Sequence, residues 1–263
     1  MFAGHLYPAD PTVLQSEIDL ALKQAQASAK PEIPGRIKTL LVPHDDYRYA
    51  LPALAHAYGH LKAGTYSLIV FIAPSVDRFN GIAISGYGYF QTPLGTVELN
   101  DPVRNEFFDQ DDDFFISEEG YPKGSSIELQ IPVLQQTLGK SKPVKIVPLL
   151  IGNRTPELCN ELVGALSELL QYNNILLVAL NTFHYASENQ GLVDEFIGLL
   201  EKQNYAELMR HVVKHGEKLG TGLGVAAVAA KASSELGARK FTLLYREHCE
   251  ATGKLYISAS YSK

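Results

Sequence analysis

Apolar segments without a single polar residue constrain the fold of this chain more than any other feature. LIVFIA at 68–73 and ILLVAL at 175–180 are two of them. A strand with one face in water alternates apolar and polar residues, whereas a strand covered on both faces does not. Amphipathic stretches with helical spacing lie between these segments. This alternation predicts an α/β fold with a mixed, mostly parallel central sheet flanked by helices.

The expected strands are short aliphatic runs bounded by turn-forming residues. They cover 38–42, 67–73, 81–85, 144–151, 174–180, 241–245 and 255–260. Between 86 and 99 the sequence predicts a hairpin, with Pro93 and Gly95 supplying the turn. The expected helices cover 11–29, 51–62, 102–108, 127–138, 156–170, 188–202, 206–215 and 224–236. No linker or composition break divides the chain, so we predict a single domain over 1–263.

Composition and charge exclude several classes of protein. Hydrophobic residues make up 46% of the chain and charged residues 20%, which suits a folded globular domain. The net charge of −6 comes without a basic run, so we expect no nucleic-acid partner. No apolar run approaches the roughly 18 residues of a membrane span, and no leader is visible, so we expect no membrane partner. Two cysteines fit a reducing compartment, and we expect a cytoplasmic protein.

Polar clusters follow three of the expected strands. The cluster 43–47 comes after LLV and contains His44, Asp45 and Asp46. The cluster 74–77 comes after VFIA and contains Ser75, and the cluster 181–185 comes after LLVAL and contains His184. Ligands of open α/β sheets bind outside the carboxyl ends of the strands. We therefore expect His44 and His184 to act as ligands or as acid–base groups, with Asp45 or Asp46 assisting.

Two readings of these clusters stay open at the level of the sequence. One of the two aspartates could instead cap the helix expected near Leu51. The segment from Gly124 to Gln130 opens a helix, so the Ser125–Ser126 start could bind an anion. Nucleotide-loop and zinc-protease motifs are absent, and no expected strand precedes GTGLG at 220–224, so we do not interpret GTGLG as a nucleotide loop.

Eight sequence blocks are spread along nearly the whole chain: AGHLYPADP, VPHDDYRYALPALAHAY, IAPSVDRFNGIAIS, TPLGTVELN, SSIELQIPVLQ, KIVPLLIG, NTFHY and TGLGVAAVAA. In composition and order these blocks resemble the Memo family, whose bacterial and archaeal members are called AmmeMemoRadiSam system protein B. The resemblance implies a fold related to class III extradiol ring-cleaving dioxygenases. It also implies an AMMECR-type protein and a radical SAM protein as partners.

The departures from the family pattern fall where the resemblance places a metal pocket. The family's donors are the histidine of P-H-A-G-Y, the histidine of P-S-H and the cysteine of C-G-x-G. This chain keeps the first as His44 but has Val76 and Thr221 at the other two positions. Ser125 replaces a further family histidine, and Asn181 replaces an aspartate. Because valine has no lone pair and a neutral hydroxyl is a poor substitute for a thiolate, we predict no inherited metal site.

The sequence therefore favours a Memo-like protein with a polar strand-end pocket, acting in binding or regulation or as a divergent metal-independent enzyme. The expected ligand is a small molecule or a peptide, and no cofactor is predicted. The residues expected to line the pocket are Tyr47, Ser75, Ser125, Glu128, Asn181, Tyr185 and Thr221.

Two alternatives have different chemistry. In the first, a rebuilt site of His44, Asp46 and His184 (or Asp45 in place of Asp46) holds iron, copper or zinc in an active dioxygenase-like enzyme. In the second, the protein hydrolyses a small anionic substrate, with His184 as general base and the Ser125–Ser126 helix start binding the oxyanion.

Overall fold

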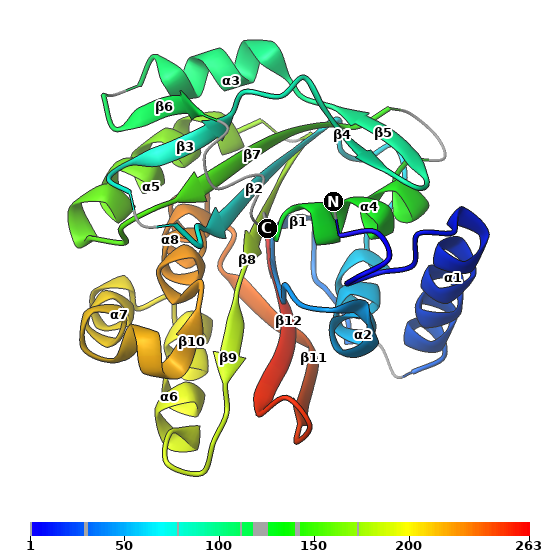
Figure 1. Cartoon of the computed structure of the whole chain (residues 1–263). Helices are drawn as coiled ribbons and strands as arrows, with labels where there is room; N and C mark the ends of the chain where they lie inside the picture. Colours follow the sequence, from blue (N-terminus) through cyan, green and yellow to red (C-terminus); the bar gives the residue numbers. More distant parts are fainter. Residues whose placement is uncertain are drawn as a thin grey trace.

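The computed structural model places a ten-stranded sheet at the centre of the molecule, in the order β10-β9-β12-β1-β8-β2-β7-β3-β6 with β11 paired to β12 (Figure 1). It describes residues 2–28, 31–77, 79–110, 112–117, 126–139, 143–172 and 174–263. The strands of the central part are β1 (Ile37–Val42), β8 (Ile175–Leu180), β2 (Leu68–Pro74) and β7 (Lys145–Ile151). These four strands run parallel, so their carboxyl ends meet at one edge. The predicted α/β class with its mixed, mostly parallel central sheet is confirmed.

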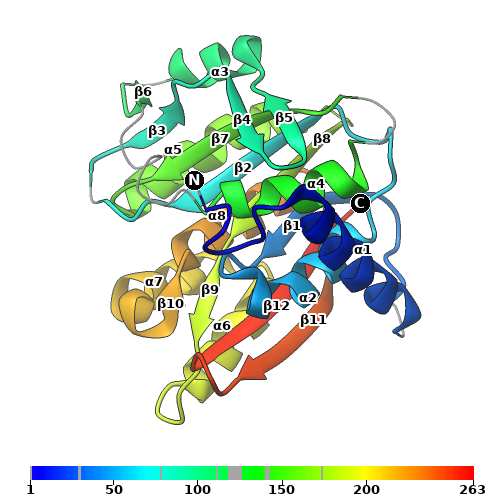
Figure 2. The same cartoon turned by 45° about the vertical axis from the view of Figure 1, so that its right-hand side comes forward.

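Antiparallel strands extend the sheet on both sides of this parallel centre. On one side β12 (Lys254–Ser262) pairs with β1, β11 (Lys240–Cys249) and β9 (Thr182–His184), and β10 (Gly220–Thr221) pairs with β9. On the other side β3 (Ile82–Ser85) pairs antiparallel with β7 and parallel with β6 (Phe114–Ser117). The predicted hairpin is confirmed as β4 (Tyr89–Thr92) and β5 (Gly95–Glu98), which lies beside β7 (Figure 2).

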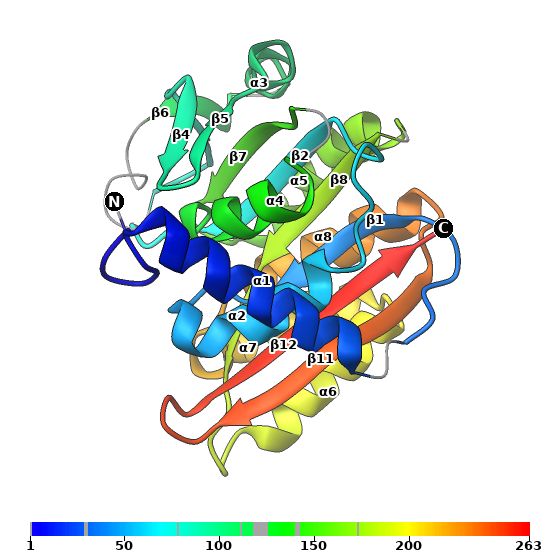
Figure 3. The same ribbon diagram turned by 90° about the vertical axis from the view of Figure 1, so that its right-hand side faces the viewer.

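Helices cover both faces of the sheet, and Figure 3 shows one layer in front of it and the other behind. The front layer holds α1 (Pro11–Ala27), α2 (Tyr47–Tyr58), η1 (Glu128–Gln130) and α4 (Ile131–Thr137). The other layer holds α5 (Pro156–Leu170), α6 (Gln190–Glu201), α7 (Tyr205–Leu219) and α8 (Leu223–Glu235). The remaining helix, α3 (Asp101–Phe108), packs on β3 and β6. Every residue of β1, β2 and β8 is buried, which explains why these strands carry no alternating pattern.

Several boundaries differ from the sequence prediction. Helix α2 begins at Tyr47 rather than near Leu51 and contains Pro52, while α7 continues past the expected end at 215. Strand β11 reaches Cys249, because it pairs with the whole of β12. The helix expected at 127–138 is divided into η1 and α4. Among the described residues, no helix combines the length and apolar character needed to cross a membrane.

The chain crosses from one neighbour of β1 to the other between β8 and β9. Strand β8 pairs with β1, and the Asn181 N–H continues that ladder by donating to the Val42 carbonyl at 2.9 Å. The next residues form β9, which pairs with β12 on the opposite side of β1. This crossing passes directly over the end of β1, where His44 lies.

Candidate functional site

His44 sits under the β8–β9 crossing and is held through its backbone. The Gln130 Nε2 donates to the Pro43 carbonyl at 3.1 Å, and the His44 N–H donates to the Thr182 Oγ1 at 3.3 Å. The ring Nε2 lies 3.1 Å from the Thr221 Oγ1, within hydrogen-bond distance. The loop after β1 therefore meets β9 and β10 at His44, although 177 positions separate His44 from Thr221.

Burial is the main cause that lowers the pKa of His44 to about 4; the Asp45 carboxylate opposes this shift, and the Lys254 ammonium adds to it. The imidazole is therefore neutral at neutral pH, so one ring nitrogen donates and the other accepts. A neutral ring suits hydrogen bonding to the Thr221 hydroxyl or to an uncharged ligand group.

We expect the imidazole of His44 to titrate near pH 4 in the folded protein. The unfolded chain binds a proton at a higher pH than the folded one, so His44 favours folding fully above about pH 6.5 and progressively less as pH falls toward 4. NMR titration of the ring carbons measures the midpoint directly, and the exposed His184 is the internal comparison. A His44 midpoint at or above the ordinary histidine value would contradict the burial argument.

Asp45 turns toward β12. Its Oδ2 accepts from the Lys254 Nζ at 2.6 Å and from the Tyr256 hydroxyl at 2.8 Å, while its Oδ1 accepts from the Asp46 N–H at 2.9 Å. Burial alone would raise the pKa of this carboxyl, but the hydrogen bonds from Lys254, the Asp46 N–H and Tyr256 outweigh it and lower the pKa. The Asp45 side chain therefore links the loop after β1 to β12 through Lys254 and Tyr256.

Asp46 is the N-cap of α2, which confirms the reading that one of the two aspartates caps this helix. Its Oδ1 accepts from the Arg48 N–H at 2.9 Å, and its Oδ2 accepts from the Arg48 guanidinium at 2.5 Å. These bonds satisfy an N–H of the first helical turn that has no partner within the helix. Both carboxylates beside His44 thus have structural partners.

His184 ends β9 with its side chain exposed. Its partner in the antiparallel register is Lys254, and residues directly opposite one another in such a pair share a face. Alternation along β9 puts Thr182 on that same face and the buried Phe183 on the other. The structure brings His44 together with Thr182 and Thr221, and it places His184 beside Lys254, two positions further along the strand.

Two of the remaining predicted residues, Tyr47 and Glu128, lie in the front layer. Tyr47 contacts η1, and Glu128 contacts the N-terminal segment. The Tyr47 hydroxyl donates to the Leu129 carbonyl at 2.7 Å. Glu128 is buried, and its Oε1 accepts from the Tyr7 hydroxyl at 2.7 Å and the Phe2 N–H at 2.8 Å. These contacts tie residues 2–7 to the layer of α2 and α4.

The other predicted residues are placed around the strand ends. The Tyr185 hydroxyl accepts from the Arg246 Nη2 at 3.1 Å and is part of a surface group with Asp194. Ser75 and Asn181 are tied through their backbone N–H groups, but their side-chain polar atoms are buried without a partner among the described residues. Ser125 lies outside the described residues.

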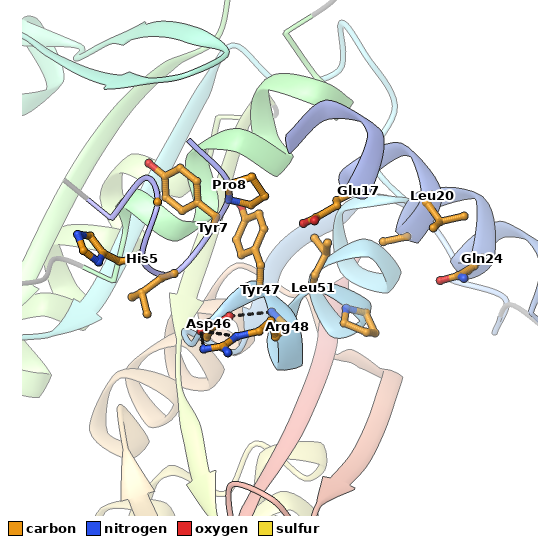
Figure 4. A pocket seen from close by; sticks show the side chains of 14 residues that line it. His5, Tyr7, Pro8, Glu17, Leu20, Gln24, Asp46, Tyr47, Arg48 and Leu51 are labelled. Carbon is orange, nitrogen blue, oxygen red and sulfur yellow. Dashed lines mark hydrogen bonds and ion pairs between the residues drawn. The ribbon is translucent and has the colours of Figure 1, made fainter. Parts of the chain in front are cut away.

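A cavity of about 500 Å³ opens beside the start of α2, between residues 4–8, α1 and α2 (Figure 4). Asp46, Tyr47 and Arg48 line it from one side, and Glu17 and Gln24 line it from α1. Of the predicted pocket residues that the structure describes, only Tyr47 lines this cavity. The cavity therefore lies near the contact between His44 and Thr221 but does not contain it.

Sequence reasoning missed two residues that shape the surroundings of His44: Lys254 and Tyr256. Thr182 belongs to the polar cluster 181–185 after a buried strand, but no role is predicted for it from the sequence. Lys254 and Tyr256 reach Asp45 only because β12 pairs with β9 and β1, and these pairings leave no local pattern in the sequence.

The metal donors that the family resemblance implies can be compared with the side chains present. His44 offers one imidazole, and Thr221 offers a neutral hydroxyl already within hydrogen-bond distance of that ring. Val76, at the third position, is an aliphatic side chain 70% exposed. Among the described residues no three His, Cys, Asp or Glu side chains are grouped as a metal site requires. These residues do not fit the family's two-imidazole, one-thiolate donor set.

Known proteins resemble this chain in sequence and in fold. Proteins named MEMO1 family protein are 27% identical in Sulfolobus acidocaldarius, over 95% of this chain and 92% of the relative, and 25% identical in Nitrosopumilus maritimus, over 92% and 89%. The crystal structure of the uncharacterized protein JW3007 from Escherichia coli K12 superposes with a TM-score of 0.59 at 14% identity, covering 86% of this chain and 100% of that one. The family model described as Memo-like protein matches residues 1–263. The chain therefore belongs to the Memo-like protein family.

Proposed function

We propose that this chain is a ligand-binding member of the Memo-like family that works without a resident metal ion. The contact between the His44 Nε2 and the Thr221 Oγ1 carries the proposal. It joins two positions at which the family pattern has metal donors. The Nε2 of the ring, which would bind a metal ion, is instead in a hydrogen bond with the Thr221 hydroxyl. A neutral imidazole and a hydroxyl form a donor–acceptor pair suited to an uncharged polar group of a small molecule or peptide.

The alternative of a rebuilt metal site requires Asp45 or Asp46 to turn toward His44. Asp45 would have to leave Lys254 and Tyr256, and Asp46 would have to leave the first turn of α2. Each departure strips hydrogen bonds from a charged or helix-terminal group, which costs about 1–3 kcal/mol per group. These costs favour metal-independent binding over dioxygenase-like chemistry at His44, Asp46 and His184.

Hydrolysis with His184 as general base is also less well supported, because His184 is exposed beside Lys254 and Ser125 of the expected oxyanion site lies outside the described residues. A second form of hydrolysis would use His44 and Thr221. The Thr221 hydroxyl next to the His44 ring has the form of a nucleophile–base pair. A general base is most effective when its pKa is near the working pH, and burial lowers the pKa of His44 to about 4. The ring therefore favours binding a hydrogen-bonding group over removing a proton from Thr221.

Restoring the donors tests the proposal. We expect the wild-type protein, expressed with iron, copper and zinc supplied and purified without chelator, to hold much less than one equivalent of metal. The variant Val76→His/Thr221→Cys adds an imidazole and a thiolate to His44, and we expect it to bind Zn²⁺ at least about a hundredfold more tightly. Mass spectrometry of the metals and a competition titration measure the two results.

Matched variants separate a rebuilt site from adventitious binding. His44→Ala in the restored background should abolish the gained affinity, whereas His5→Ala, at a histidine near the N-terminus, should leave it unchanged. Stoichiometric metal in the wild-type protein that is lost in His44→Ala would overturn the proposal.

A cytoplasmic location is part of the same proposal. Cys159 is buried and Cys249 half-buried, and both are free thiols, which agrees with a reducing compartment. An AMMECR-type protein and a radical SAM protein remain the partners proposed from the family resemblance, and co-purification with tagged protein tests them.

A further inference from the structure

A second cavity, of about 470 Å³, is lined by Gly220 of β10 and by neither His44 nor Thr221. Its walls are the turn between β7 and α5 at 152–155, the end of α7 and the start of α8. This is the edge where the parallel strands β7 and β8 end, the usual ligand position in an open α/β sheet. The volume lies in the range of small-molecule sites, about 300–1,000 Å³.

Basic side chains from two elements line this cavity. Arg154 comes from the β7–α5 turn, while Lys214, His215 and Lys218 come from the last turns of α7. No carboxylate lines the cavity among the residues whose side chains the structure describes. The whole chain carries a net charge of −6, so the grouping is a local reversal of sign. Such a concave basic surface concentrates anions.

The pKa of His215 responds to these basic side chains. Burial lowers the pKa of this imidazole, and the positive charges of Lys214, His211 and Lys218 lower it further, against the opposing effect of Glu195. Burial is the largest cause of this shift, and the cationic neighbours add to it.

The start of α8 directs backbone N–H groups into the same cavity. Gly222 is its N-cap in a left-handed conformation with φ of 80°, and no side chain of the described residues caps the helix. Gly222, Leu223 and Gly224 all line the cavity. The first N–H groups of a helix have no partner within it and carry a partial positive charge, so they bind anions.

Arg154 is fixed against this first turn. A Cβ placed on Gly224 would lie 3.3 Å from the Cβ and 3.4 Å from the Cδ of Arg154, so the arginine stem runs over the glycine. The Arg154 Nη1 donates to the Gly152 carbonyl at 3.4 Å. The guanidinium is thus held at the rim of the cavity, next to the uncapped N–H groups.

Asn181 gives an independent sign of a missing partner at this place. It is 1% exposed, and neither its Oδ1 nor its Nδ2 has a hydrogen-bond partner among the described residues. Alternation along β8 puts Asn181 on the face of Leu177 and Ala179, which α8 covers. Its Cα is 2.9 Å from a Cβ built on Gly222, so the residue lies directly behind the N-cap of α8. Buried amides are rarely left without partners, so a polar group at the start of α8 would complete the hydrogen bonding of Asn181.

We propose that the cavity between the β7–α5 turn, α7 and α8 binds a phosphate group. The N–H groups at the start of α8 donate to the phosphate oxygens, and Arg154, Lys214 and Lys218 contact these oxygens from the rim. The volume left beyond one phosphate suits a small phosphate monoester better than the free ion. This site is separate from the His44–Thr221 contact, and it does not rest on the function proposed for that contact.

Calorimetry on the full chain with three probes tests this site. We expect saturable binding of ribose 5-phosphate, weaker binding of inorganic phosphate and none of ribose. Binding of inorganic phosphate that equals or exceeds that of ribose 5-phosphate would assign the site to the free ion. Absence of saturable binding by both phosphate probes at millimolar concentrations would overturn the proposal.

Charge-removing variants locate the binding. Lys214→Gln/Lys218→Gln changes two exposed side chains on α7, so folding should be preserved, and we expect about a tenfold or larger loss of affinity. Arg154→Gln should cause a loss of similar size. Lys231→Gln removes the same charge from α8, but Lys231 pairs with Glu235 at the far end of the helix, so affinity should not change. Equal affinities in the wild type and the double lysine variant would place any phosphate binding elsewhere.

Discussion

Replacement of Gly220 by alanine is expected to lower the free energy of unfolding by about 3 kcal/mol or more. This loss is larger than the one expected for Asp45→Asn. Gly220 has φ of 139° and ψ of −163°, a region of backbone space that is open almost only to glycine. An added Cβ would also lie 2.1 Å from the Thr182 carbonyl oxygen and 2.9 Å from the Phe183 Cα. These are backbone atoms of β9, which cannot move aside as a side-chain tip can.

Chemical denaturation of Gly220→Ala beside Gly164→Ala measures the effect. Gly164 lies in α5, is exposed and has nothing within 4 Å of an added Cβ. Alanine is there expected to raise stability by about 0.5–1 kcal/mol, because glycine is a poor helix residue. A loss under about 1 kcal/mol in Gly220→Ala would contradict the close approach of β10 to β9. The pair of variants separates that approach from the general effect of removing a glycine.

The parallel centre of the fold could be predicted because its sequence signal is local. Strands β2 and β8 are buried on both faces, so their runs of aliphatic residues are themselves the pattern. The hairpin of β4 and β5 was likewise predictable from a proline and a glycine at its turn. In each case a few adjacent residues contain all the information that the element needs.

The short strands could not be predicted because their signal is not local. Strand β10 has two residues, Gly220 and Thr221, and exists only where β9 passes beside it. Helix α7 comes directly before GTGLG, so the prediction that no strand precedes this segment is confirmed, while β10 lies within the segment. The glycines there are required by close contacts with residues 180–183, which are distant in sequence.

The surroundings of His44 could be predicted only in part. The sequence places His44 after β1 and His184 after β8; His44 does follow β1, whereas His184 ends the short strand β9, which the sequence did not predict. The direction of the carboxylates beside His44 could not be read from adjacent residues. Asp45 turns to Lys254, 209 positions away, while Asp46 turns to Arg48 two positions away. Which of two neighbouring aspartates faces a pocket depends on the cations that the fold brings near each one.

Removing the charge of Asp45 is expected to have the second large effect. Asp45→Asn keeps the shape of the side chain but leaves the Lys254 ammonium without its carboxylate and weakens the bond from the Tyr256 hydroxyl. The side chains of Asp45 and Lys254 are 19% and 32% exposed, so solvent screens part of the attraction. We therefore expect a loss of about 2 kcal/mol in the free energy of unfolding, less than for a fully buried pair.

The pH dependence distinguishes this charge from mere packing. The folded-state pKa of Asp45 lies below the ordinary aspartate value of 3.8, so its contribution is fully present above that value and is lost as pH falls through the folded-state pKa. The difference in stability between the wild type and Asp45→Asn should therefore be constant near neutral pH and shrink in acid. Glu207→Gln, in an exposed pair with Arg210, is the matched control and should cost less than about 0.5 kcal/mol. A wild-type–variant difference that persists unchanged in strong acid would mean that Asp45 acts through its shape alone, and that the tie between the loop after β1 and β12 does not depend on the Lys254 ion pair.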